Sequence, residues 1–176
     1  MSASNKFVKQ VWKDFMKNQG HDFHCLKNLK IVSTTSKFKN NHEKDLRIKF
    51  KFKIGNENLN RLKTLHGGLI SSLVDSCGSL SLSLTGLWFT GVSTDLNVSF
   101  LQSAGTMGDE IDIEAQVDSI GRTLAYTSVI VKNPATSEIL ARGSHTKFIA
   151  KTINHERNVK FDESGDRVIE ENACFQ

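Results

Sequence analysis

The chain has 176 residues, of which 38% are hydrophobic and 24% charged, and its formal net charge is +4. This length is enough for one hydrophobic core and too short to argue for two. The weak positive charge would suit a phosphate-bearing ligand, but it is common in proteins that bind no polyanion. Three widely spaced cysteines and six scattered histidines form no CxxC pair and no metal-ligand pattern. We therefore expect neither a disulfide framework nor a metal site.

Residues 1–25 contain no apolar segment of the kind that secretory signal peptides carry. Residues 66–94 are low in charge and could be mistaken for a membrane span, but they contain several serines and Asp75. An acid at bilayer depth costs about 2.5–3.5 kcal/mol, so this stretch predicts a buried helix followed by a loop. We expect a soluble protein of the cytoplasm or of mitochondria.

Residues 6–17 place apolar side chains on one side of a helix and lysines on the other. The pattern favours a surface helix that caps the domain. A mitochondrial presequence is the alternative, although the segment has no arginine and contains Asp14.

Two strands are expected next, over residues 26–38 and 46–54. In the second, apolar residues alternate strictly with Arg47, Lys49, Lys51 and Lys53, which predicts one buried face and one basic face. A solvated basic face is the simpler interpretation. Platforms for nucleic acid carry aromatic and basic side chains on the same surface, whereas here they alternate to opposite faces. We therefore expect no nucleic-acid partner.

A His-Gly-Gly turn at residues 66–68 opens a predicted long helix whose one acid is Asp75. At about 100° per residue, the large apolar side chains fall within one arc. Asp75 points away from the centre of that arc, on a face of small residues that includes Gly68, Ser71 and Ser79. The acid therefore lies on a face that another element approaches.

Four strands follow in quick succession, over residues 91–101, 110–119, 122–132 and 138–149. Consecutive strands joined by short turns pair antiparallel, and the long helix has to cross one face of their sheet to bury its apolar arc. The predicted fold is α+β: an antiparallel sheet of about six strands wrapped around one long central helix, the hotdog architecture, with an N-terminal helix. Residues 1–150 form this single domain, and the polar residues 151–176 are expected to be a mobile tail.

Five motifs resemble those of the acyl-CoA thioesterases of the hotdog superfamily, especially the small eukaryotic members related to phenylacetyl-CoA thioesterases. They are residues 62–68 (LKTLHGG), 73–75 (LVD), 91–97 (GVSTDLN), 121–128 (GRTLAYTS) and 143–148 (GSHTKF). The resemblance runs from about the first helix to Ile149 and leaves out the tail. A lone HGG would be a weak signal, but the whole set in this order is specific.

The resemblance implies a role for each matching catalytic position. Asp75 would be the base or the nucleophile, Asn60 would help to place the hydrolytic water, and Gly67 would offer its backbone N–H to the thioester carbonyl. Ser93 would assist, and His66 would either line the same pocket or only cap the turn. No cofactor is implied, because CoA is itself part of the substrate and of the product.

The family also suggests how the substrate binds. CoA usually lies along the surface of a dimer with its phosphates near basic residues, and the candidate contacts here are Gly68, Arg122, His145 and Lys147. Charged strand residues are more often simply solvated. The resemblance further implies a homodimer, often paired into a tetramer, and a medium or long fatty acyl chain.

The spacing of two of these residues predicts a dimer independently of the family. A free N–H at a helix N-terminus stabilises a developing oxyanion by about 3–4 kcal/mol. Gly67 and Asp75 are eight residues apart, which is about 12 Å along one helix, too far to act on one carbonyl. If both act, Gly67 of one chain lies opposite Asp75 of a second, in an obligate dimer.

Other interpretations stay open. Asp75 could be a buried structural acid. A hydratase or dehydratase acting on acyl thioesters would need a histidine paired with the acid, and the helix after Asp75 contains none. The protein could also bind acyl-CoA without hydrolysing it, as a sensor or carrier. Asn60, Gly67 and Ser93 together argue against that alternative, but only turnover decides.

Overall fold

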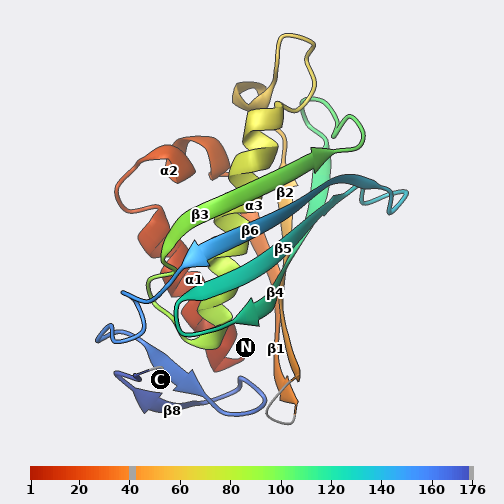
Figure 1. Ribbon diagram of the computed structural model, residues 1–176. Coiled ribbons are helices and arrows are strands. Elements are labelled where there is room, and N and C mark those ends of the chain that lie inside the picture. The colour runs from red at the N-terminus through yellow and green to blue at the C-terminus, as the bar shows by residue number, and fades with distance from the viewer. Residues whose placement is uncertain (40–42, 175–176) are drawn as a thin grey trace.

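The protein forms one six-stranded antiparallel sheet that curves around a central helix (Figure 1). The computed structural model describes residues 1–39 and 43–174. Its helices are α1 (Ala3–Phe15), α2 (His21–Leu26) and α3 (Gly67–Leu82), with short 3₁₀ turns η2 (Asn56–Asn58) and η3 (Ser83–Thr85). Its strands are β1 (Leu29–Lys39), β2 (Glu43–Lys53), β3 (Val92–Phe100), β4 (Glu110–Ile120), β5 (Leu124–Lys132), β6 (Ile139–Phe148), β7 (Val159–Phe161) and β8 (Val168–Glu171).

The main sheet has the strand order β1-β2-β4-β5-β6-β3, so β1 and β3 are its edges. The helix α3 lies across one face of it, and its apolar arc, which starts at Leu69 and continues into η3 at Leu84, is buried against alternating side chains of the strands. These features confirm the predicted hotdog fold. No helix in the two described ranges is long and apolar enough to cross a membrane.

Two glycines allow α3 to approach the sheet closely. A Cβ atom on Gly143 of β6 would lie 2.4 Å from Cγ1 of Val74. A Cβ atom on Gly78 of α3 would lie 2.7 Å from Oγ1 of Thr127 and 3.2 Å from Nδ1 of His145. Such distances are shorter than packed carbon atoms tolerate. The middle of α3 can therefore touch β5 and β6 only because both positions lack a side chain.

The basic face of β2 is neutralised by its neighbour β4. Lys51 contacts Glu110 at 2.6 Å and Asp112 at 3.6 Å, and Lys49 lies 3.8 Å from Glu114. Direct cross-strand pairs of opposite charge stabilise a sheet modestly. The lysines of this strand therefore face acids of the same chain.

The two ends of the chain differ from expectation. The N-terminal helix forms three residues earlier than predicted, and the short α2, which carries no clear helical pattern, was not predicted. The tail expected to be mobile is folded as far as Cys174: β7 and β8 pair as a hairpin, and Asn158 and Phe161 are buried. The ring of Phe161 packs against Phe7 of α1, with centroids 5.7 Å apart. One aromatic anchor and a buried amide hold a segment whose composition alone indicates disorder.

Gly143→Ala should destabilise the fold because the new methyl group overlaps Val74, a branched side chain that cannot swing aside. We expect a loss of about 1–3 kcal/mol in the free energy of unfolding. Gly121→Ala is the control, since a Cβ there would meet only the Leu124 carbonyl oxygen, at 3.5 Å. Urea denaturation of both variants measures the difference, and equal midpoints would contradict close packing at Gly143.

Candidate active site

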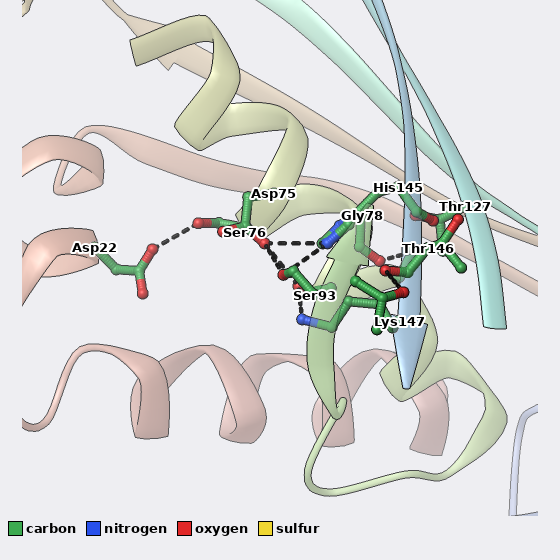
Figure 2. Close-up of polar contacts among 12 residues, drawn as sticks. Asp22, Asp75, Ser76, Gly78, Ser93, Thr127, His145, Thr146 and Lys147 are labelled. Carbon is green, nitrogen blue, oxygen red and sulfur yellow. Dashed lines mark hydrogen bonds and ion pairs between the residues drawn. The ribbon is translucent and has the colours of Figure 1, made fainter. Parts of the chain in front are cut away.

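One carboxylate oxygen of Asp75 accepts hydrogen bonds from two serines and lies near His145, and Figure 2 shows the acid between Ser93 and His145. Its Oδ1 lies 3.2 Å from Oγ of Ser93, 3.4 Å from Oγ of Ser79 and 3.4 Å from Nε2 of His145. Its side chain is 47% exposed, and among the described residues Oδ2 has no hydrogen-bond partner. One oxygen is therefore fixed by the protein, and the other is available to water or substrate.

The two serines that donate to Asp75 each contact a buried basic side chain. Nε2 of His145 lies 2.9 Å from Oγ of Ser93, and Nζ of Lys147 donates to Oγ of Ser79 at 2.7 Å. A hydroxyl has one proton. A serine that accepts a hydrogen bond from His145 or Lys147 therefore donates its own proton to Asp75. Two relays, His145–Ser93 and Lys147–Ser79, therefore converge on Oδ1.

The contacts of His145 fix its tautomer. If Ser93 gives its proton to Asp75, the proton on His145 must be on Nε2. Nδ1 is buried and, within the described part of the chain, has no partner. An unpartnered acceptor there costs less than the charged ring would. Burial, together with the charge of Lys147, lowers the pKa of His145 to about 4, against the opposing effect of Asp75. The imidazole is therefore neutral at physiological pH.

Lys147 is a buried cation below the acid. Its side chain lies under α3, and the residue is only 5% exposed. Burial lowers the pKa of its ammonium group, while the negative charges of Asp75 and Asp22 oppose that shift. The lysine thus places a positive charge behind Asp75 without reaching the surface.

A β-bulge turns Ser93 toward the acid. Ser93 pairs with Lys147 and Leu96 pairs with His145, and the register of β3 against β6 shifts between Ser93 and Asp95. Lys147 and His145 both face α3, so their partners Ser93 and Leu96 share that face although they are three residues apart. Thr94 is the extra residue, and its hydroxyl donates to the Thr146 carbonyl at 3.2 Å. Bulges often re-aim one side chain in this way.

The N-terminus of α3 offers one free backbone donor. Nδ1 of His66 accepts from the Gly68 amide at 2.8 Å, so His66 is the N-cap and that amide is occupied. Among the described residues, no acceptor lies within hydrogen-bond distance of the Gly67 amide. Of the Gly67 and Gly68 amides, only that of Gly67 is therefore available to a carbonyl oxygen, with the positive end of the helix dipole behind it.

Asn60 holds the loop that precedes α3. Its Oδ1 accepts from the amides of Leu62 and Thr64, at 2.8 and 3.2 Å, and its Nδ2 donates to Oγ1 of Thr64 at 2.8 Å. This is the local bonding typical of a turn-forming asparagine. The structure gives Asn60 a positioning role in the loop, and its placing of a water remains a prediction.

The basic residues proposed to contact CoA have two different environments. Arg122 is exposed in the turn between β4 and β5, so its contact with a phosphate remains a prediction. His145 and Lys147 are 1% and 5% exposed and are bonded to serines below Asp75. The expectation that these two bind phosphate at the surface therefore conflicts with their burial. Their place is behind the acid.

A cavity of about 750 Å³ opens beside Asp75. Its walls come from the end of α1, from α2, from α3, from the loop before β3 and from the start of β3. On one side, Ser76 donates to Oδ1 of Asp22 at 2.6 Å, and His21 contacts Ser72 at 2.8 Å. Phe15, Trp88 and Phe89 supply aromatic surface. Its volume is in the range of small-molecule sites.

No group of three or more His, Cys, Asp or Glu side chains in residues 1–39 and 43–174 could hold a metal ion. The polar side chains that line the cavity instead include three aspartates, several hydroxyls, an imidazole and an ammonium: Asp14, Asp22, Asp75, Ser72, Ser76, Ser79, Ser93, His21 and Lys147. Such a set can activate water or attack a carbonyl directly.

Sequence reasoning missed the relays because their members lie far apart in the chain. Asp75, Ser93 and His145 come from α3, β3 and β6. The histidine that the helix after Asp75 lacks is supplied by β6, so the stated reason against a histidine–acid pair is wrong. A signal was present: His145 and Lys147 alternate with the same period as the inward-facing residues of their strand.

Comparison with known proteins agrees with this architecture. The model of the thioesterase superfamily matches residues 62–139. A candidate esterase of Schizosaccharomyces pombe is 38% identical over 152 residues, which are 86% of this chain and 88% of that protein. The chain belongs to the thioesterase superfamily. The expected resemblance to hotdog thioesterases is thereby confirmed, and so is the prediction of a thioester hydrolase.

Two vertebrate members of the superfamily are also similar. Mouse acyl-coenzyme A thioesterase 13 is 33% identical over 149 residues, covering 85% of this chain and 99% of its own length. The crystal structure of zebrafish thioesterase superfamily member 2 superposes with a TM-score of 0.69 at 29% identity, over 84% of this chain and 98% of that one. This chain therefore has residues that these relatives lack.

The burial of His145 should appear in the pH dependence of stability. Its folded pKa of about 4 is below the ordinary value of 6.5. Between these values the unfolded chain binds more protons, so the free energy of unfolding falls as the pH falls through that window. His145→Gln keeps a donor but does not titrate, and it should remove this part of the slope. Urea titrations of both proteins at several pH values test this, and identical slopes would contradict it.

Proposed function

We propose that the protein hydrolyses acyl-CoA thioesters to free acid and CoA. The single observation that carries this proposal is Asp75, which lines a cavity, has an Oδ1 that accepts from Ser79 and Ser93, and has an Oδ2 with no hydrogen-bond partner among the described residues. The relatives named as acyl-CoA thioesterases support the choice of substrate class.

The chemistry begins at the free oxygen of Asp75. Oδ2 either removes a proton from a water that attacks the thioester carbon, or attacks that carbon itself. In both routes the carbonyl oxygen becomes negative, and an amide such as that of Gly67 stabilises it. Collapse of the intermediate breaks the C–S bond, and the CoA thiolate takes up a proton, from the protonated acid in the first route and from solvent in the second. In the second route the acyl group stays on Asp75 as an anhydride, and a water then hydrolyses it to the free acid.

The two relays behind Asp75 fit a role in orienting the carboxylate during this reaction. Ser93 and Ser79 hold the carboxylate in one orientation, and each donor remains in place as the acid gains a proton or an acyl group. The buried ammonium of Lys147 donates to Ser79, and the neutral ring of His145 contacts Ser93 without adding a second charge to the cluster. We propose that all four residues position Asp75; of the four, His145 does not line the cavity, whereas Ser79, Ser93 and Lys147 do.

We further propose that the active unit is a dimer with sites shared between chains. Because α3 carries both Gly67 and Asp75 about 12 Å apart, one chain does not supply both groups to one carbonyl. The outer edge of β3 is the end of the sheet, and Val92, Leu96 and Phe100 are exposed on it at 63%, 39% and 54%. Unpaired apolar edges favour strand pairing with a second chain. Two β3 edges that pair would bring the two α3 helices together, and two such dimers could then form a tetramer.

Other activities fit this site less well. A hydratase would need its histidine to reach the substrate, but the side chain of His145 is fully buried and committed to Ser93. A carrier that only binds acyl-CoA would need no open carboxylate oxygen with two relays behind it. The acyl group that the cavity accepts, a medium or long fatty chain by family resemblance, remains a prediction, as does a cytoplasmic or mitochondrial location.

Asp75→Asn should lower kcat by about a hundredfold or more, because the amide keeps the size but removes the base or nucleophile. Thiol release from acyl-CoAs of increasing chain length measures this and also names the preferred substrate. Asp118→Asn is a matched control, since Asp118 also accepts from a serine but lies outside the cavity. Tight acyl-CoA binding without thiol release from the wild type would favour the carrier instead.

Mixing two inactive variants tests the shared site. Gly67→Pro removes only the free amide, since proline is tolerated at the first helical position and His66 before it is already extended, at φ −69° and ψ 132°. Gly67→Ala, which keeps the amide, is its control. A heterodimer of Gly67→Pro with Asp75→Asn contains one intact site, so unfolding and refolding the mixture should restore about a quarter of wild-type activity. If the refolded mixture regained no activity, the shared site would be wrong.

A further inference from the structure

The segment 151–174, called here the C-terminal segment, reaches back to the wall of the active-site cavity. Its Thr152 lines that cavity directly. Its Asn158 is fully buried, and Oδ1 of this residue accepts from the Trp88 amide at 2.9 Å. The Val159 amide donates to the Gly86 carbonyl at 3.0 Å. The loop between α3 and β3 is therefore hydrogen-bonded to the C-terminal segment at two points.

The same segment holds both aromatic side chains that this loop contributes to the cavity. The guanidinium carbon of Arg157 lies 3.4 Å from the centre of the Trp88 ring, a cation–π contact. The His155 ring meets the Phe89 ring edge-on, with centroids 4.4 Å apart. Phe89 is 49% exposed, so few other side chains restrain it.

A second set of contacts fixes the helix on the opposite side of the cavity. The amides of Ala3 and Ser4 donate to the carbonyls of Asp166 and Gly165, at 3.2 and 3.0 Å, and Phe7 packs between Trp88 and Phe161. Figure 1 shows the C-terminal segment beside the N-terminal end of α1. The other end of α1 supplies Asp14 and Phe15 to the cavity.

We propose that the C-terminal segment determines acyl-group specificity by fixing the Trp88–Phe89 wall of the cavity, with His155, Arg157 and Asn158 as its positioning residues. The inference rests on the proposed function, because it takes this cavity as the acyl site. None of the three residues touches Asp75 or the relays behind it, so the segment shapes the binding space and leaves the chemical step alone.

The superfamily model matches residues 62–139 and so ends before β6 and the C-terminal segment. The mouse relative is matched along 99% of its length yet covers only 85% of this chain. The core of the enzyme can therefore be built without every part of this chain.

The test is the double variant His155→Ala/Arg157→Ala, which removes both ring contacts from partly or fully exposed positions and leaves the buried Asn158 in place. Without these contacts, the side chains of Phe89 and Trp88 should move more freely, and the space for the acyl group should become larger. The ratio of kcat/KM for a long-chain to a short-chain acyl-CoA should then rise about tenfold, through KM and with kcat for the short substrate unchanged. A general loss of stability would instead lower activity on both substrates in the same proportion.

Lys160→Ala is the matched control, a cation of the same segment that is exposed and contacts neither ring. A ratio that stays within twofold of wild type in the double variant would overturn the proposal. Affinities for non-hydrolysable acyl-CoA thioethers of the same two lengths provide a second readout. If the wild type released no thiol, the proposed function would fail, yet these affinities would still show whether the segment selects the acyl group.

Discussion

The close approach of one helix to one sheet, at two points where one partner has no side chain, is the constraint on which the site depends. Gly78 and Gly143 let α3 approach β5 and β6 until Asp75 lies above two inward-facing residues of β6. Any larger residue at either point would lift the helix, and hydrogen bonds of 2.7–2.9 Å would lengthen beyond use. Packing in this protein is therefore also the means by which the acid is aligned.

Burying an imidazole and an ammonium under a helix is costly unless each has a partner. The structure meets this requirement with two serines, each of which also donates to Asp75. The arrangement leaves one atom unsatisfied among the described residues of this cluster, Nδ1 of His145. A neutral ring tolerates that state, and this is a physical reason for the low pKa of the histidine. The positions of the protons in this cluster and the charges of its side chains therefore depend on the same contacts.

Much of this could be predicted from sequence, for identifiable reasons. The alternation in β2 and the single acid of α3 are strong local periodicities, and they place the sheet, the helix and Asp75. The role of Lys147 was missed although its alternation places it on the inner face, because a lysine on a strand is normally solvated and because the close approach of α3 at Gly78 is not visible in the sequence. The fold of the C-terminal segment was also missed. One buried asparagine and a few ring contacts hold this segment in place, and its overall composition does not reveal such contacts.

The bulge at Thr94 divides β3 into two parts with opposite phase. Residues after it follow the alternation that places Leu96, Val98 and Phe100 on the inner face, while Ser93 before it reaches the same face one position out of step. If the same residues ran as a regular strand without the bulge, Ser93 would point to the face opposite Leu96 and away from α3. The backbone conformation at Thr94, and not only the identity of the serine, therefore decides whether the acid has its partner. The hydrogen bond from the Thr94 hydroxyl to the Thr146 carbonyl thus contributes to the alignment of a carboxylate that Thr94 does not touch.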